Sequence, residues 1–561
     1  MDYIKEIAKI VKIDGYTADD IEKMIVLPKE LSLGDYSLPC FRFAKELKKS
    51  PAQIAIELAN TTVKNGIIKS VTAVNGYLNF TIDKAEFTKN TILTILKEGQ
   101  NYGSSDIGKN RVICLDYSSI NIAKPFHIGH LSTTVIGASL YRIFNKLGYK
   151  SEGINHLGDW GTQFGKLITA YKLWGDKNDI EKRGVKSLLD IYVKFHQEAE
   201  KDEKLNDQGR YWFKKIEDGD KEALSIFEWF KEITLKEVQK TYDRLHIHFD
   251  SYAGESFYND KMQAVLDALK QKGLLEESDG AMVVKFDNGD PPCLVQRSDG
   301  ATLYATRDLA AAIYRKNHYD FYKCLYVVAY QQNLHFRQVF NVLKMMGYDW
   351  SNDLVHVNFG MVSLEDGAMS TRKGNIVFLE DVLDNAVQKA YGIIEEKNPN
   401  LDDKKATAEK IGVGAIVFSA LQNNRIKDTV FSYDKVLNFD GETAPYVQYT
   451  YARCCSVLAK TGEIEGDVDF SGVENNEALE LAKLLDKYPQ TIIDASVKYE
   501  PSLVTRLVMD TAQMFNKFYL EHRINDENQA IKNARIMLTQ ATKIVIEDGF
   551  RLLGIQCPTK M

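Results

Sequence analysis

Residues 112–131, VICLDYSSINIAKPFHIGHL, carry the strongest indication of how this chain folds and what it binds. The apolar run 112–115 predicts a buried strand, and the turn His127-Ile128-Gly129-His130 follows it. A strand that enters a helix through such a turn suits a nucleoside triphosphate, because a helix N-terminus favours negative charge. Gly129 lets a flat base approach the backbone, and the two imidazoles can donate hydrogen bonds to phosphate oxygens. The stretch therefore predicts an ATP site around this turn.

Further cationic groups are placed to serve the same triphosphate. Lys124 lies three residues ahead of the first imidazole, and Pro125 stiffens the turn. The loop 367–375, GAMSTRKGN, holds Arg372 and Lys373 between glycines, so it can close over the phosphates and balance charge on the leaving pyrophosphate. The alternatives are a structural turn whose histidines cap a helix, and a charge pair that is only solvated. Which of the two loop cations reaches the phosphates stays open.

Composition limits the class of protein. The chain has 561 residues, of which 44% are hydrophobic and 27% charged, as is typical of a globular protein with several domains. No apolar run reaches the roughly 20 residues of a membrane span. The first residues lack the pattern of a secretory signal, so a cytoplasmic location is expected. Seven scattered cysteines without a CxxC pair favour neither a disulfide framework nor a structural metal site. A net charge of −7 argues against binding nucleic acid through global charge, although not against a local basic footprint.

The order of predicted elements indicates an α/β core with further parts at both ends. From residue 111 onward, strand, glycine-rich turn, helix and strand predict a doubly wound parallel sheet. Amphipathic helices and two hairpin-like stretches, around Asp279-Gly280 and Asp299-Gly300, interrupt it before a buried strand at 324–329. After Gly374 the chain is predicted to be almost wholly helical. For residues 1–100 we predict a small α+β unit, with strands at 35–38, 71–74 and 78–82 and helices at 44–49 and 51–61.

One predicted helix carries groups that suit a guanidinium. In 303–311, LYATRDLAA, Tyr304 and Asp308 are four residues apart and share a helix face. A planar guanidinium needs a carboxylate that it can meet through two parallel hydrogen bonds, with an aromatic group or hydroxyl beside it. Capping or ion pairing within the helix is the structural alternative.

Two strand ends add polar side chains. Residues 154–165, INHLGDWGTQFG, place the amides Asn155 and Gln163 and the carboxylate Asp159 at the expected rim of a pocket. Residues 327–336, VVAYQQNLHF, place Gln332 there. Ligands of α/β proteins bind at the carboxyl edge of the sheet, where these residues would lie. A glycine-rich turn with an aromatic plug is the alternative for the first of the two stretches.

These motifs, in this order, resemble those of class I aminoacyl-tRNA synthetases, specifically of the arginyl branch. Residues 118–131 are similar to its HIGH signature, and 367–375 to its degenerate KMSKS loop. Two departures are Ala368, where class I enzymes have lysine, and Ile120, where the family usually has proline. The resemblance covers essentially the whole chain and is weakest in 175–300.

The resemblance implies an α/β fold with a Rossmann-like doubly wound parallel-sheet catalytic domain, an N-terminal α+β domain and a C-terminal all-α bundle. Tyr446, Tyr449 and Tyr451 of the bundle either stack on unpaired bases or pack its helices. The expected domains are 1–105, contacting tRNA; 106–380, catalytic, with an insertion at about 175–300; 381–435, a helical linker contacting the tRNA stem; and 436–561, binding the anticodon.

The implied activity is that of an arginine–tRNA ligase. L-Arginine reacts with ATP to give arginyl-adenylate and pyrophosphate, and arginine is then transferred to the 3′-terminal adenosine of tRNA(Arg). Mg²⁺ accompanies ATP, and a monomer is expected. The implied catalytic residues are His127, His130, Lys124, Arg372 and Lys373. Those implied to bind arginine are Ser119, Asn121, Asn155, Tyr304, Asp308 and Gln332. Those implied to bind ATP are His127, Gly129, His130, Met369 and Ser370.

Two other classes of protein are alternatives to an arginine–tRNA ligase. A small-molecule nucleotidylyltransferase also uses an HxGH turn, but it has no use for a long helical C-terminus. A catalytically inactive tRNA-binding paralogue would keep both end domains, but it should have lost His127, His130 or the loop cations. All of these residues are present.

Overall fold

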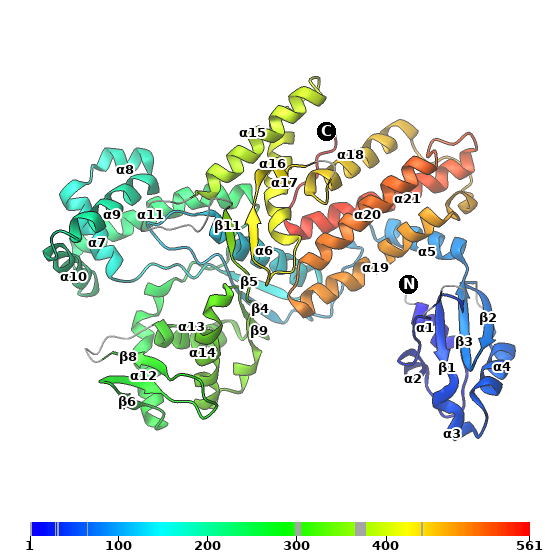
Figure 1. The fold of residues 1–561 in the computed structure, drawn as a ribbon, viewed down its shortest axis with the longest axis horizontal. Coiled ribbons are helices and arrows are strands. Elements are labelled where there is room, and N and C mark those ends of the chain that lie inside the picture. Colours follow the sequence, from blue (N-terminus) through cyan, green and yellow to red (C-terminus); the bar gives the residue numbers. More distant parts are fainter. Residues whose placement is uncertain are drawn as a thin grey trace. The chain divides into compact units, whose positions relative to one another are not determined.

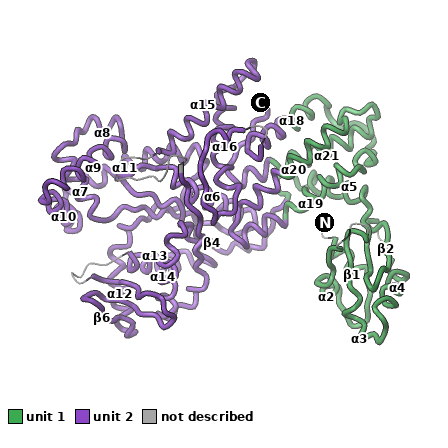
Figure 2. Tube along the Cα trace, in the orientation of Figure 1, with its two compact units in different colours: residues 1–102, 453–489, 510–546 green, residues 103–452, 490–509, 547–561 purple. Residues whose placement is uncertain are grey.

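The structure, a computed structural model, describes residues 3–28, 30, 33–63, 66–297, 304–364, 377–438 and 441–561. It divides into two compact units (Figures 1 and 2). The first comprises residues 1–102, 453–489 and 510–546, and the second comprises 103–452, 490–509 and 547–561. Among the helices that are described, none combines the length and the apolar character needed to cross a membrane.

A three-stranded antiparallel sheet organises the N-terminal part of the first unit, in the strand order β1-β3-β2. Leu38, Leu78 and Phe80 of this sheet are completely buried. The α+β character predicted for residues 1–100 is therefore confirmed. The elements are α1 (Tyr3–Ile10), α2 (Ala18–Glu22), β1 (Tyr36–Pro39), the 3₁₀ helix η2 (Cys40–Phe43), α3 (Ala44–Leu47), α4 (Pro51–Thr61), β2 (Ile68–Val74), β3 (Tyr77–Ile82), α5 (Lys84–Glu98) and η3 (Gly99–Asn101).

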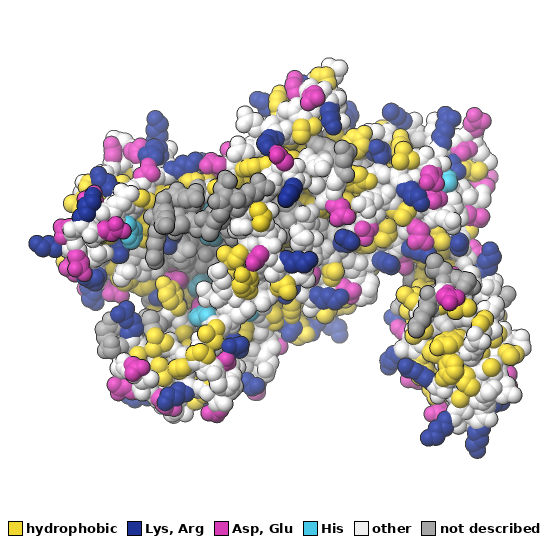
Figure 3. Space-filling view, in the orientation of Figure 1, with side chains coloured by type: hydrophobic (Ala, Val, Ile, Leu, Met, Phe, Trp, Pro, Cys, Tyr) yellow, Lys and Arg dark blue, Asp and Glu magenta, His cyan; other side chains and the backbone are white. Residues whose placement is uncertain are grey.

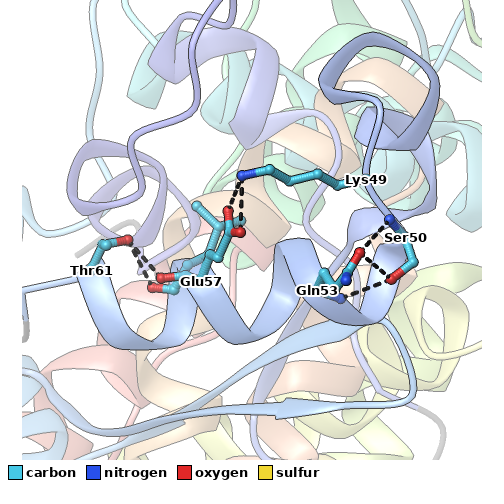
Figure 4. A network of polar contacts seen from close by, with 6 residues as sticks. Lys49, Ser50, Gln53, Glu57 and Thr61 are labelled. Atoms are coloured by element: carbon cyan, nitrogen blue, oxygen red, sulfur yellow. Dashed lines mark hydrogen bonds and ion pairs between the residues drawn. The ribbon is translucent and has the colours of Figure 1, made fainter.

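The start of α4 shows how local sequence sets an element (Figure 4). Ser50 Oγ accepts a hydrogen bond from the Gln53 backbone N–H at 3.3 Å, and Gln53 Oε1 accepts one from the Ser50 backbone N–H at 3.2 Å. Pro51 takes the first helical position, where no N–H is needed. Because this reciprocal cap satisfies N–H groups that a helix start leaves unpaired, α4 has the bounds predicted from the sequence.

A four-stranded parallel sheet in the order β10-β9-β4-β5 lies at the centre of the second unit. Cys114 and Leu115 of its central strand are completely buried, as the apolar run predicted. The doubly wound sheet is therefore confirmed. Its elements are β4 (Val112–Asp116), η4 (Ile128–His130), α6 (Leu131–Lys146), β5 (Lys150–Ile154), α13 (Tyr304–Tyr319), β9 (Lys323–Tyr326), η6 (Tyr330–Gln332), α14 (Asn333–Met345), η7 (Asp349–Asp353) and β10 (Leu354–His356).

The segment between β5 and α13 is mainly helical and ends in a small antiparallel sheet, β6-β7-β8. Asp279 and Gly280 both have positive φ, 49° and 76°, as the predicted two-residue hairpin turn requires. The second predicted hairpin, at Asp299-Gly300, lies outside the described residues. The elements are α7 (Thr162–Trp174), α8 (Lys177–Arg183), α9 (Val185–Ala199), α10 (Lys204–Glu217), α11 (Lys221–Arg244), η5 (Glu255–Lys261), α12 (Met262–Gln271), β6 (Glu276–Ser278), β7 (Ala281–Val284) and β8 (Cys293–Gln296).

The rest of the chain is mostly helical, as predicted. A short parallel pair, β11 with β12, is the difference from that prediction. The elements are β11 (Val362–Leu364), α15 (Leu379–Lys397), α16 (Lys404–Leu421), β12 (Thr429–Phe431), α17 (Tyr433–Val436), α18 (Ala444–Thr461), η9 (Phe470–Val473), α19 (Asn476–Lys498), α20 (Ser502–Glu521) and α21 (Gln529–Leu553).

Candidate active site

The carboxyl ends of β4 and β9 mark the place of the candidate site. β4 pairs with β5 on one side and with β9 on the other, so the direction of winding reverses between β4 and β9. Such a reversal opens a crevice at the carboxyl edge of the sheet, where ligands bind. A cavity of about 420 Å³ lies there, with Asp116 and Tyr326, the last residues of the two strands, in its lining. Five residues predicted to bind arginine also line it: Ser119, Asn121, Tyr304, Asp308 and Gln332.

The HIGH turn, residues 127–130, follows β4 in the chain, and its two histidines lie against each other. The ring centroids of His127 and His130 are 4.0 Å apart. His127 Nδ1 accepts a hydrogen bond from the Gly129 backbone N–H at 3.1 Å, and His130 Nδ1 accepts one from the His127 backbone N–H at 3.3 Å. These bonds cap η4, the 3₁₀ turn that leads into α6, so the histidines do have the capping role of the structural alternative, although α6 itself has no side-chain cap.

Besides capping the turn, each of the two imidazoles has a second ring nitrogen that can form a hydrogen bond. Burial lowers the pKa of His130 to about 3, assisted by the nearby His127. Burial and the charge of Lys124 also lower the pKa of His127. Both rings are therefore neutral near neutral pH. Because each Nδ1 accepts a backbone N–H, the single ring proton must reside on Nε2. Each ring thus keeps one Nε2–H donor that the turn does not use, which suits a phosphate oxygen.

Asp308 is the carboxylate of the cavity that was predicted to meet a guanidinium. Its Oδ2 lies 2.5 Å from Nε2 of His335, and its side chain is about a quarter exposed. Burial alone would raise the pKa of Asp308, but the hydrogen bond and charge of His335, with smaller effects from His156 and Arg315, lower it overall. The carboxylate is therefore charged at neutral pH. Tyr304, one helical turn before it on α13, is 64% exposed.

A second acid, Glu255, lines the same cavity although no sequence motif pointed to it. Its Oε2 lies 3.3 Å from Nη1 of Arg307. Burial raises the pKa of Glu255 to about 7, against the lowering effects of Arg307 and Lys124, while Asp308 raises it further. Besides Asp116, the cavity lining thus holds Asp308, which is charged at neutral pH, and Glu255, whose pKa lies near neutrality.

A buried ion pair fixes the floor of the cavity. Nη2 of Arg315, a residue only 1% exposed, lies 2.8 Å from Oδ2 of Asp116. The other oxygen, Oδ1, accepts a hydrogen bond from Ser119 Oγ at 2.8 Å. Nη2 of the same arginine also lies 3.3 Å from Nδ1 of His156. The serine predicted to bind arginine is therefore oriented by a carboxylate that is itself held by a buried cation.

Two residues expected at the pocket rim lie elsewhere. Asn155 is completely buried, its Nδ2 donates to the Tyr242 hydroxyl at 2.9 Å, and it is not part of the cavity lining. Asp159 is also completely buried, and it is paired with Lys231 at 2.9 Å and bonded to Ser256. Both side chains turn toward partners from the insertion, which became neighbours only through folding. The structure therefore does not place Asn155 where the predicted contact with arginine needs it.

The cations predicted for the triphosphate are only partly placed. Lys124 lines a small separate cavity with Ala123 and Gln163, and its charge influences both His127 and Glu255. Its charge therefore acts on both the histidine turn and the acidic cavity. The loop residues Met369, Ser370, Arg372 and Lys373 lie outside the described residues.

Several site residues escaped the sequence analysis. Asp116 could have been found, because a carboxylate that ends a buried strand beside a glycine-containing turn lies at the ligand edge. Glu255 and Arg315 carry no such signal, since each is a common charged residue in a segment without a motif. His156 and His335 lie within the motifs at 154–165 and 327–336, but the sequence alone indicates no partner for either ring.

Three family models match the chain. The class I tRNA synthetase (R) catalytic domain matches residues 91–433, the DALR anticodon-binding domain matches 447–561, and the arginyl-tRNA synthetase N-terminal domain matches 2–82.

Relatives match along the full length. The arginine–tRNA ligase of Clostridioides difficile is 50% identical over 552 residues, which cover 98% of each chain. That of Alkaliphilus metalliredigens is 49% identical over 564 residues and covers both chains completely. Among solved structures, the arginyl-tRNA synthetase of Thermus thermophilus superposes with a TM-score of 0.80 at 24% identity, covering 96% of each chain. That of Plasmodium falciparum gives 0.77 at 25% identity, covering 96% of this chain and 94% of its own.

Proposed function

Because the chain belongs to the arginyl-tRNA synthetase family of class I and is an arginine–tRNA ligase, we propose that its 420 Å³ cavity binds the arginine substrate. Asp308 and Glu255 receive the guanidinium, with Tyr304 beside them. Ser119 and Asn121 hold the ammonium and carboxylate ends of the amino acid, and Gln332 completes the wall. The observation that carries this proposal is that Asp308, Glu255 and these polar groups line one cavity at the switch point of the sheet, where the third acid, Asp116, is already paired with Arg315.

The chemistry requires no nucleophile from the protein. The carboxylate of arginine attacks the α-phosphorus of ATP, pyrophosphate leaves, and a terminal ribose hydroxyl of tRNA then displaces AMP from the acyl carbon. The protein aligns the reactants and stabilises the charge that develops. The unused Nε2–H groups of His127 and His130 donate to the α-phosphate, and Lys124 with Arg372 or Lys373 faces the outer phosphates. A neutral donor suits this task, because it adds no like charge beside Lys124.

Mg²⁺ enters as the counter-ion of ATP. The described side chains at the turn are imidazoles and an ammonium, whereas Mg²⁺ prefers oxygen ligands. The phosphate oxygens of the substrate would therefore supply the ligands of the ion, because the described residues of the turn offer it no carboxylate.

Contacts with tRNA(Arg) extend over both ends of the chain. Apolar side chains gather on the exposed face of the N-terminal part (Figure 3). Among the residues of this part, Phe41 is 52% and Tyr77 38% exposed, with ring centroids 5.2 Å apart, and such rings suit stacking on unpaired bases. In the C-terminal domain Tyr449 is exposed, whereas Tyr451 is buried and donates to Glu547, which is a packing role. The enzyme acts as a cytoplasmic monomer in this proposal.

The pH dependence of arginine binding tests the pocket. With a pKa raised to about 7, Glu255 is neutral in the free enzyme at lower pH, so binding a guanidinium must first release its proton. We expect the Kd for arginine to rise about tenfold per pH unit below pH ~7 and to be flat above it. Titration calorimetry in two buffers of different ionisation enthalpy would measure both the Kd and the proton released.

Glu255→Gln supplies the matched comparison. Its side chain has the same shape and no charge at any pH, so arginine should bind more weakly at pH ~8 and show no slope below ~7. A wild-type Kd that does not change across this range would remove Glu255 from the pocket.

A further inference from the structure

The loop between β4 and the HIGH turn has an unusual backbone. Ser118, Ser119 and Ala123 have φ values of 68°, 45° and 57°, in the left-handed region that favours glycine. Side-chain-bearing residues are held there only when the surroundings impose the conformation, and such strain concentrates at functional sites. The loop carries the cavity residues Ser119 and Asn121. Something outside the loop must therefore hold it in place.

Helix α11 of the insertion supplies much of this support. The Tyr242 hydroxyl lies 2.7 Å from Ser118 Oγ, and both side chains are buried. Thr234 Oγ1 accepts a hydrogen bond from the Ala123 backbone N–H at 3.0 Å. The hydroxyl hydrogen of Thr234 is used on the Phe230 carbonyl at 2.7 Å, which leaves the oxygen to accept. Two of the three residues with positive φ are thus tied to one helix.

The same side of α11 also contacts the loop that follows β5. Tyr242 also accepts the hydrogen bond from Asn155, and Lys231 pairs with the buried Asp159. Lys231, Thr234 and Tyr242 are spaced by three and eight residues, which brings them to one side of a helix. The ring of Tyr242 packs edge-on against Phe126, one residue before the HIGH turn, with centroids 5.4 Å apart.

We propose that Tyr242 and Thr234 are positioning residues for amino-acid activation, which hold the two ends of the strained loop in register with the two substrates. This rests on the substrate assignment proposed above. Tyr242 acts at Ser118, directly before the cavity residue Ser119, so it positions the arginine side of the site. Thr234 acts at Ala123, directly before Lys124, so it positions the ATP side. Helix α11 thereby contributes to catalysis through the loop, whereas Glu255, elsewhere in the insertion, contacts the substrate directly.

Two variants distinguish this role from general stabilisation. Tyr242→Phe keeps the ring packing and loses the hydroxyl. It should raise KM for arginine about tenfold and leave KM for ATP unchanged. Thr234→Val keeps the shape and loses the acceptor. It should raise KM for ATP or lower kcat about tenfold and leave KM for arginine unchanged. Steady-state charging of tRNA, with arginine and ATP varied in turn, measures all of these constants.

Two further variants serve as controls. Thr234→Ser keeps the hydroxyl oxygen and should have the same kcat and KM values as the wild-type enzyme. Tyr252 follows α11 in the chain, and its hydroxyl bonds to the exposed Gln239 of that helix at 3.4 Å. Tyr252→Phe removes this hydroxyl and should leave kcat and both KM values unchanged.

The inference is overturned if Tyr242→Phe and Thr234→Val change the same constants by the same factor, or if neither changes any constant. Asp308→Asn, measured in parallel, separates this failure from that of the pocket assignment. If Asp308→Asn leaves KM for arginine unchanged, the pocket itself is wrong. If Asp308→Asn raises this KM and the α11 variants have no effect, only the positioning role is wrong.

Discussion

Replacing Asp308 with asparagine is expected to reduce kcat/KM for arginine by about 10³-fold, because a buried guanidinium then loses one of its two charged partners and keeps only Glu255. Asparagine has nearly the same shape and can still bond to His335, which lies 2.5 Å from the carboxylate. The loss should therefore appear in the arginine dependence, while KM for ATP remains unchanged. Charging of tRNA with arginine varied at saturating ATP is the measurement.

Specificity should change in the same variant. The wild-type site is expected to reject citrulline, which has the shape of arginine without its charge, because a carboxylate would be left unpaired. Asp308→Asn should narrow the preference for arginine over citrulline. Asp320→Asn is the matched control, since Asp320 directly follows the same helix, and its side chain is 90% exposed and paired only at the surface, with Lys316. An unchanged arginine dependence in Asp308→Asn would contradict the assignment of the pocket.

Replacing His127 with asparagine is expected to slow formation of arginyl-adenylate by about 10²-fold, the usual effect of removing one donor to a developing charge. Asparagine is a favoured N-cap, and its side-chain oxygen can accept the Gly129 N–H that His127 Nδ1 accepts now. The turn is thus preserved, whereas the Nε2–H donor is lost. Single-turnover release of pyrophosphate would measure the step.

The pH profile provides an independent check on the histidines. Because burial lowers the pKa of both His127 and His130, the native rings stay neutral as the pH falls through roughly 6.5, the ordinary histidine value. At saturating arginine, the wild-type rate should therefore show no step at that pH. A step there that disappears in His127→Asn would mean that the charged imidazolium is the active form. An intact rate in His127→Asn would leave His127 with a capping role alone.

Much of the site could be recognised from local patterns. The turn at 127–130, the strand before it and the cap at Ser50 depend on residues within four positions of each other, so their sequence contains nearly all the relevant physics. Tyr304 and Asp308 share a helix face for the same reason, and both line the cavity. The loop cations at 372 and 373 were equally visible in the sequence, and their role remains a prediction.

Other parts of the site depended on contacts between distant segments. The sequence alone indicates the motif residues, their order, and the strands and helices that carry them. These features depend on hydrogen bonds and apolar periodicity between residues that are close together in the chain. Three features follow only from how the insertion packs on the sheet. Asn155 bonds to Tyr242 and is not in the cavity lining, Glu255 joins Asp308 in that lining, and Tyr242 reaches Ser118 across 124 positions. The burial of a side chain and the identity of its partner depend on this packing. In a segment without a motif, the sequence therefore does not indicate which buried group a charged or hydroxyl side chain will contact.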